Sequence, residues 1–209
     1  MAEFTDRADA GRQLAAALAP WRGTEAVVVG IPRGGVVVGA AVARELSLPL
    51  TAVVVRKLGA PAREEFAVGA IADDIRFIDD QAARAEGADA AALHVVEERE
   101  RAELRRRSRL FAGGPAVTGR VALVVDDGVA TGATAIVACR ALRARGARRV
   151  VLAVPVAPAR WHPPADVVDE FVCPHRETEF WAVGQFYDDF TQTADAEVVD
   201  LLSNDPRAG

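Results

Sequence analysis

The chain has 209 residues, of which 51% are hydrophobic, so it can bury one substantial core and a disordered protein is excluded. Its formal net charge of −5 argues against general nucleic-acid binding, because phosphate backbones are bound by surplus Lys and Arg. Residues 1–12 carry charges of both signs, and no stretch reaches the ~20 apolar residues of a membrane span. Neither a secretory signal nor a membrane segment is therefore expected.

The first half of the chain alternates predicted helices and strands. Asp6 and Asp9 are the candidate N-caps of the first helix. In chain order, the predicted elements are a helix through residue 19, a strand at 26–29, a turn at 30–35, a helix at 36–46, a strand at 50–55, a charged segment at 58–65, and a hairpin of strands 67–71 and 75–78. Because Gly and Pro interrupt the charged segment, it is expected to be exposed and mobile.

The second half continues this alternation. Its predicted elements are a helix at 89–111, a strand at 121–125, a helix ending near 146, strands at 149–154 and 167–172, an aromatic-rich stretch at 180–190, and a helix at 194–202. In the first of these helices, Glu97 and Glu103 each precede an Arg by four positions, which favours a solvated helix face over a nucleic-acid patch. Strands alternating with helices predict an α/β fold, with a mostly parallel twisted sheet flanked by helices.

The two cysteines indicate no special chemistry. Cys139 and Cys173 lie far apart, without Cys or His at metal-ligand spacing, so neither a disulfide framework nor a structural zinc site is expected. Both are interpreted as small buried hydrophobic side chains. With no targeting segment, the expected compartment is the cytoplasm.

The strongest functional signal is the run at residues 124–134, VVDDGVATGAT. Asp126 and Asp127 directly follow a buried strand, where adjacent carboxylates are costly unless a sugar diol, a metal ion or backbone donors compensate them. The small turn that follows opens a helix, whose free amides and positive dipole end suit a phosphate dianion. The run therefore predicts a sugar-phosphate ligand, whereas the alternative makes Asp126 a helix cap and Asp127 a surface charge. Neither a nucleotide P-loop nor a dinucleotide-binding pattern nor a serine-hydrolase elbow occurs.

This run resembles the phosphoribosyl-pyrophosphate (PRPP) signature of type I phosphoribosyltransferases. The resemblance implies that the acidic pair holds the ribose 2′ and 3′ hydroxyls and that the following loop wraps the 5′-phosphate. The substrate-binding residues implied by the run are Asp126, Asp127, Gly128, Val129, Ala130, Thr131, Gly132, Ala133 and Thr134.

The resemblance also implies a second anion site for the diphosphate. The turn after the first strand takes the position of the family's pyrophosphate loop, where paired glycines permit close backbone approach and Arg offers a forked cation. Residues 58–66 correspond to the family's flexible loop, which closes over the reaction. The turn contributes Pro32, Arg33, Gly34 and Gly35, and the implied catalytic residues are Arg33, Arg56, Lys57, Asp126 and Asp127. The alternatives are an ordinary strand–helix turn and unpaired cations at a strand end.

The aromatic stretch resembles the base-recognition hood of hypoxanthine-guanine phosphoribosyltransferases. The resemblance implies that Trp181 stacks on the acceptor. Asp188 would then lie near the pyrophosphate and a Mg²⁺ ion, which is otherwise held mainly by PRPP. A packed aromatic cluster with a capping Asp is the alternative. For residues 175–177, just before the hood, a solvated polar turn is favoured over contact with the acceptor.

Two departures leave the acceptor unassigned. Ala130 stands where the purine enzymes carry an Asp proposed to handle the base proton, and in this it resembles the adenine-specific and other branches. Val154-Pro155-Val156 lacks the Lys that those enzymes place for the purine 6-oxygen. A 6-oxopurine acceptor is therefore not expected.

The predicted protein is a Mg²⁺-dependent phosphoribosyltransferase that transfers phosphoribose from PRPP to a nucleobase or amine and releases pyrophosphate. It forms a single domain, with an N-terminal helix at 1–24, a core at 25–160 carrying a helical insertion at 86–115, and a hood with a final helix at 161–209. Two alternatives stay open: a non-catalytic regulator that senses PRPP or a related nucleotide, and an RNA-interaction module around residues 105–109. No nucleic-acid or membrane partner is expected, and a homodimer is left open.

Overall fold

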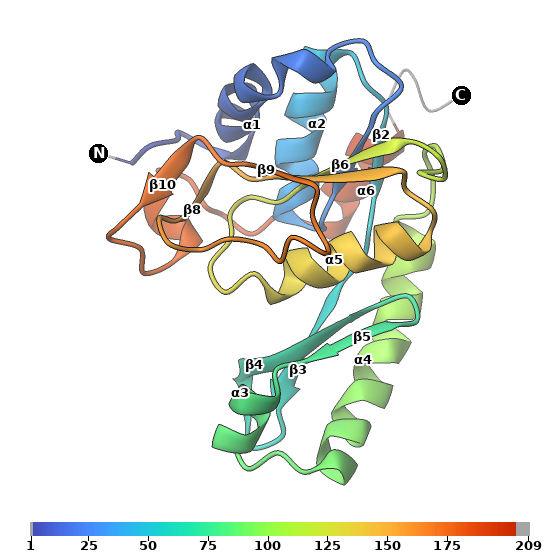
Figure 1. The fold of residues 1–209 in the computed structure, drawn as a ribbon, viewed down its shortest axis with the longest axis vertical. Coiled ribbons are helices and arrows are strands. Elements are labelled where there is room, and N and C mark those ends of the chain that lie inside the picture. The colour runs from blue at the N-terminus through green and yellow to red at the C-terminus, as the bar shows by residue number, and fades with distance from the viewer. Residues whose placement is uncertain (1, 204–209) are drawn as a thin grey trace.

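A five-stranded parallel sheet forms the centre of the computed structural model, which describes residues 2–203 (Figure 1). Its strand order is β2-β1-β6-β7-β9, and each neighbouring pair is parallel. The strands span Leu50–Ala52 (β2), Val27–Gly30 (β1), Val121–Val125 (β6), Arg149–Ala153 (β7) and Glu170–Val172 (β9). The predicted α/β fold with a parallel sheet is confirmed.

Helices cover both faces of this sheet. Because successive side chains of a strand point to opposite faces, neighbouring residues of one strand pack against different helices. Leu123 of β6 belongs to the buried cluster shared with α1, α2 and α6, whereas Val124 packs with α5 on the other face. Figure 1 shows α1 and α2 on one side of the sheet and α5 on the other. The helices span Arg7–Ala17 (α1), Gly34–Leu46 (α2), Ala133–Ala144 (α5) and Asp195–Ser203 (α6), and a 3-10 turn, η1, spans Ala19–Trp21. Of the two candidate caps of α1, Asp6 is the N-cap. In the described part of the chain, no helix has both the length and the hydropathy to cross a bilayer.

An arm made of residues 56–110 extends away from the sheet (Figure 1). It consists of an antiparallel sheet of order β3-β4-β5 and two helices. These elements span Arg56–Ala60 (β3), Arg63–Ala72 (β4), Ile75–Ile78 (β5), Asp80–Ala85 (α3) and Ala90–Leu110 (α4). The predicted hairpin is confirmed by β4 and β5, and the predicted long helix is confirmed by α4.

The expectation of an exposed segment at 58–65 is confirmed for residues 61–64 but not for Leu58 and Ala60, and its mobility stays a prediction. Residues 58–60 belong to β3 and 63–65 to β4, and the two strands pair with register shifts around Gly59. Leu58 and Ala60 are fully buried, so alternate residues of β3 serve as core. The Gly and Pro residues therefore mark a strand irregularity and a hairpin turn. Helix α3 has no counterpart among the predicted elements, because six residues are too few to establish a helical period.

The C-terminal region adds a small parallel pair, β8 (Val156–Pro158) and β10 (His175–Glu177), followed by a 3-10 turn, η2 (Val183–Phe186). The expectation of a solvated polar turn at 175–177 is therefore wrong, because these residues form a backbone ladder with β8. The strand expected at 167–172 begins only at Glu170. Phe4 bridges to Tyr187, which joins the N-terminal segment to the hood.

The two cysteines differ in burial. Cys139 is fully buried on α5, and burial raises the pKa of its thiol to about 12. Cys173 is half-buried, and burial raises its pKa to about 11. The interpretation as buried hydrophobic side chains is confirmed for Cys139 and holds only in part for Cys173.

Candidate functional site

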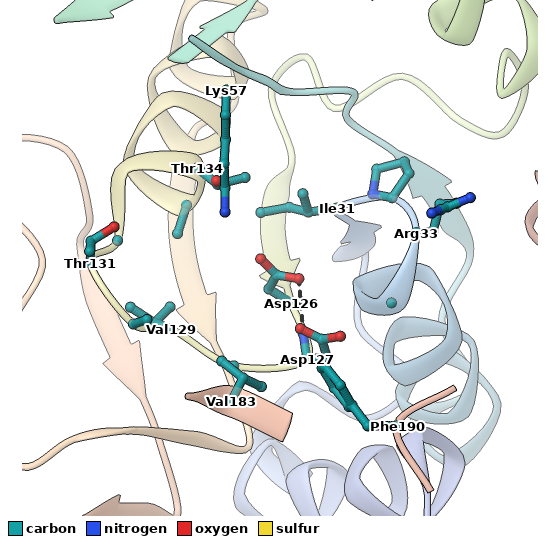
Figure 2. Close-up of a pocket in the computed structure, with 16 residues that line it drawn as sticks. Ile31, Arg33, Lys57, Asp126, Asp127, Val129, Thr131, Thr134, Val183 and Phe190 are labelled. Carbon is teal, nitrogen blue, oxygen red and sulfur yellow. Dashed lines mark hydrogen bonds between the residues drawn. The ribbon is translucent and has the colours of Figure 1, made fainter. Parts of the chain in front are cut away.

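A cavity of about 340 Å³ opens beyond the carboxyl ends of β1 and β6 (Figure 2). Parallel sheets gather ligands at this edge, where loops leave strands and enter helices. The residues that line it are Ile31, Pro32, Arg33, Gly34, Lys57, Asp126, Asp127, Gly128, Val129, Ala130, Thr131, Gly132, Thr134, Ala135, Val183 and Phe190. The cavity thus brings together the acidic pair, the loop after it, the turn after β1 and one of the two predicted basic residues of β3.

The acidic pair lies at the centre of this cavity (Figure 2). The amide of Asp127 donates a hydrogen bond to Oδ1 of Asp126 at 2.9 Å. Burial raises the pKa of Asp126 well above its ordinary value, and the neighbouring Asp127 carboxylate raises it further. Burial also raises the pKa of Asp127, although the hydrogen bond from Arg7 lowers this pKa in part. The N-cap of α5 is Gly132, so Asp126 does not take the alternative role of a helix cap.

The loop after the acidic pair ends at the start of α5. Gly132 has the left-handed φ of 86° that glycine adopts readily, and no side chain caps the helix here. The side chains of Thr131 and Thr134 border the cavity. Trp161 supports the loop from outside, because its Nε1 donates to the Thr131 carbonyl at 3.1 Å and a Cβ added to Gly132 would overlap its ring. Ala133 is not among the lining residues.

The turn after β1 packs directly against the acidic pair. A Cβ added to Gly34 would overlap Oδ2 of Asp127, and one added to Gly35 would lie 2.6 Å from the Val125 carbonyl oxygen. Glycine is therefore required for this approach. The Pro32–Arg33 peptide is cis. The Arg33 guanidinium points away from the acidic pair in Figure 2, and its Nη1 lies 3.7 Å from Oδ1 of Asp195 on α6.

The two basic residues of β3 point in different directions, as successive strand residues do. Lys57 reaches into the cavity from the arm, with its ammonium directed toward the acidic pair (Figure 2). Arg56 instead forms a two-pronged ion pair with Glu100 of α4, with Nε and Nη2 at 2.8 and 2.6 Å from Oε2. Arg56 is not among the lining residues.

The hood contributes Val183 and Phe190 to the cavity wall. Trp181 is 87% exposed and does not line the cavity. Asp188 is exposed and also lies outside the lining, with its amide donating to the Phe4 carbonyl at 2.9 Å. Within residues 2–203, no three His, Cys, Asp or Glu side chains are grouped so as to hold a metal ion by themselves.

Three residues at the site were not indicated by the sequence pattern. Arg7 of α1 donates to Asp127, the Tyr187 hydroxyl donates to the Asp127 carbonyl at 2.6 Å, and Trp161 donates to the Thr131 carbonyl. Each comes from a segment far from the acidic run in sequence. Periodicity and local motifs carry no signal for such contacts.

The acidic pair, the loop after it and Lys57 thus line one cavity at the edge of a parallel sheet. Residues 3–191 match the family model described as phosphoribosyl transferase domain. Two Mycobacterium tuberculosis proteins, from strains H37Rv and CDC 1551 and each named provisionally as a phosphoribosyl transferase, are 50% identical over 207 residues. The matches cover 95% of this chain but 46% of those proteins, so the chain spans about half the length of these relatives.

Among solved structures, TT1426 from Thermus thermophilus is 40% identical, with a TM-score of 0.74 over 96% of this chain and 97% of that one. The chain belongs to the phosphoribosyl transferase domain family. The membership in a phosphoribosyltransferase family that the sequence indicated is thereby confirmed.

Proposed function

We propose that the chain binds PRPP and transfers its phosphoribosyl group to a nitrogenous acceptor, a nucleobase or an amine, with release of pyrophosphate. The observation that carries this proposal is the convergence of the acidic pair, the phosphate loop, the glycine turn and Lys57 on one cavity. Family membership supports the transfer reaction in general.

The ribose of PRPP suits the acidic pair, and its 5′-phosphate suits the loop that follows this pair. Ribose hydroxyls are donors, so they would compensate the buried carboxylates of Asp126 and Asp127. The amides at the start of α5 have no side-chain cap, and with Thr131 and Thr134 they offer donors to the phosphate. Trp161 would hold this loop in place.

The diphosphate would lie between Lys57 and the turn at residues 32–35. Lys57 is the cation whose side chain enters the cavity in Figure 2. Arg33 contributes its backbone turn to the lining, while its guanidinium is near Asp195. Because Arg56 is paired with Glu100, we propose that it anchors β3 to α4. Contact with the diphosphate is then proposed for Lys57.

We expect Mg²⁺ to be held jointly by the phosphates of PRPP and by carboxylates of the cavity, because the described residues form no metal site by themselves. Mg²⁺ commonly takes one or two carboxylates together with substrate phosphates. Asp126 and Asp127 supply such carboxylates in the cavity, whereas Asp188 lies outside its lining. When bound, the ion would neutralise charge on the leaving diphosphate.

In the transfer, the lone pair of the acceptor nitrogen forms a bond to C1 of the ribose. The bond from C1 to the diphosphate oxygen breaks, and its electron pair leaves with pyrophosphate. The acceptor nitrogen then loses its proton to solvent. The chain's contribution would be positioning and electrostatics, with carboxylates favouring a cationic, oxocarbenium-like sugar and Lys57 favouring the leaving anion.

Pyrophosphate release tests this function. The protein would be incubated with PRPP, Mg²⁺ and a panel of purines, pyrimidines and simple amines, and we expect release with at least one acceptor. The double variant Asp126→Asn with Asp127→Asn should abolish PRPP binding in calorimetry, because the hydroxyl acceptors lose their charge. Unchanged affinity in that variant would refute the assignment of the sugar site.

A non-catalytic PRPP-binding regulator is the second candidate. The observation that favours it is that protein carboxylates engage two of the three predicted cations, Arg33 and Arg56. The same panel discriminates between the two functions. PRPP binding with no pyrophosphate release from any acceptor would favour the regulator.

A further inference from the structure

Arg7 at the start of α1 is joined to the acidic pair, although 120 positions separate it from Asp127. Its Nε lies 2.8 Å from Oδ2 of Asp127. The two side chains are only 12% and 17% exposed, respectively. An ion pair this protected is screened less by salt than a surface pair.

Three further contacts fix the Arg7 guanidinium. Its Nη1 donates to the Thr191 carbonyl at 2.7 Å, and its Cζ lies 4.0 Å from the centre of the Phe190 ring. A Cβ added to Gly34 would lie 2.6 Å from Nε of Arg7, so the glycine turn also closes on it. Arg7 therefore connects α1, the acidic pair and the end of the hood. Only a planar, forked cation can make the edge and face contacts together.

The Arg7 contact restricts Asp127 to one arrangement. Oδ2 accepts from Arg7 and faces Gly34, and the Asp127 carbonyl accepts from the Tyr187 hydroxyl. The second carboxylate oxygen, Oδ1, takes no part in this ion pair. In the proposed complex, that oxygen would accept from a ribose hydroxyl.

Arg7 favours the charged form of the Asp127 carboxylate. The charged and titratable groups that face Asp127 are Asp126, Lys57, Arg7 and, through its hydroxyl on the Asp127 carbonyl, Tyr187. The hydrogen bond and charge of Arg7 lower the pKa of Asp127, against the larger effect of burial. Without Arg7, Lys57 would be left to offset the repulsion between the two carboxylates.

We propose that Arg7 is a positioning residue for donor binding: it orients Asp127 so that one oxygen is presented to the ribose and ties this carboxylate to the hood at Phe190 and Thr191. The inference rests on the proposed function, since it concerns the same sugar site.

The test compares Arg7→Gln, Arg7→Lys and the matched control Arg12→Gln. Arg12 lies on the same helix, pairs with Asp9 at 3.2 Å, is 54% exposed and does not line the cavity. PRPP binding would be measured by calorimetry at neutral pH, and thermal unfolding would verify that each variant is folded.

We expect Arg12→Gln to match the wild type and Arg7→Gln to weaken PRPP binding on the order of tenfold. Arg7→Lys should recover part of the lost affinity, since it keeps the charge but not the planar fork that contacts Asp127 and Phe190 together.

The possible failures are distinguishable. Absence of PRPP binding by the wild type would refute the proposed function and this inference with it. Wild-type binding together with unchanged affinity in Arg7→Gln would refute the inference alone. A loss of affinity in Arg7→Gln that Arg7→Lys does not relieve at all would show a general structural role, and would also overturn the inference.

Discussion

The adjacent carboxylates of Asp126 and Asp127 lie in an environment that disfavours their charge. Both have raised pKa values because they are withdrawn from water. Asp127 has Arg7 as a direct partner, whereas Asp126 accepts its hydrogen bond from the Asp127 amide. Such a group holds its charge at neutral pH only at a cost to folding.

Asp126→Asn should therefore stabilise the protein at neutral pH by about 1 kcal/mol. Because the pKa of Asp126 is raised on folding, the folded protein retains a proton that the unfolded chain has released, and the free energy of unfolding falls as pH rises through that window. Asn keeps the acceptor for the Asp127 amide and removes the charge. Urea unfolding of both proteins at several pH values measures the difference, which should shrink toward acidic pH.

Asp127→Asn is the control for this prediction. It removes the same charge but leaves the Arg7 guanidinium without its carboxylate, so we expect no stabilisation. Equal stabilisation by both substitutions, or none by Asp126→Asn, would contradict the account of a costly unpaired charge.

At the scale of elements, the alternation of β3 decides which basic residue reaches the cavity. Arg56 faces α4 and pairs with Glu100, so that the next residue, Lys57, projects to the opposite side. Glu100 is almost fully buried and also accepts a hydrogen bond from Arg99. We therefore expect the ion pair between strand and helix to hold Lys57 in its position at the cavity.

Glu100→Ala should destabilise the protein by about 2 kcal/mol, because it leaves a partly buried Arg56 without a partner. It should also weaken PRPP binding through Lys57. The control is Glu64→Ala, since Glu64 is 67% exposed and pairs with the surface-exposed Arg99. That change should stay within about 0.5 kcal/mol. Urea unfolding of the two variants, followed by PRPP titration, checks both effects, and similar losses in the two would refute the positioning role.

At the scale of the whole molecule, the cavity connects segments from every part of the chain. The lining residues come from the turn after β1, from the arm, from the loop after β6 and from the hood. The contacts of Arg7 add α1 to this set. A ligand that fills the cavity would bind the folded chain and not the unfolded one.

PRPP with Mg²⁺ should therefore raise the thermal unfolding temperature of the whole chain. At a concentration of ~100 times Kd, the gain is about 2.7 kcal/mol. For a domain of this size, that corresponds to a shift of roughly 5–10 °C. Differential scanning calorimetry measures it, with the double variant Asp126→Asn and Asp127→Asn as the control that should not respond. A shift of the same size in that variant would place the ligand elsewhere.

The parallel α/β sheet, the long helix of the arm and the acidic run with the loop that follows it could be predicted from the amino-acid sequence alone. These features depend on local order: apolar runs of strand length, helical spacing, and Asp, Gly and Thr adjacent in the chain. The glycine turn at residues 32–35 could also be predicted, because paired glycines after a strand indicate a close backbone approach. The structure shows that the group approaching Gly34 is the Asp127 carboxylate.

Which side chains meet at the cavity could be learned only from the three-dimensional fold. Arg7, Trp161 and Tyr187 contact the acidic run from distant segments, and Phe190 rather than Trp181 borders the cavity. Likewise, pairing with β4 turned a segment rich in Gly, Pro and charge into a strand. Neighbours in the fold but not in the chain leave no periodic or compositional trace, so these contacts could be known only once the chain had folded back on itself.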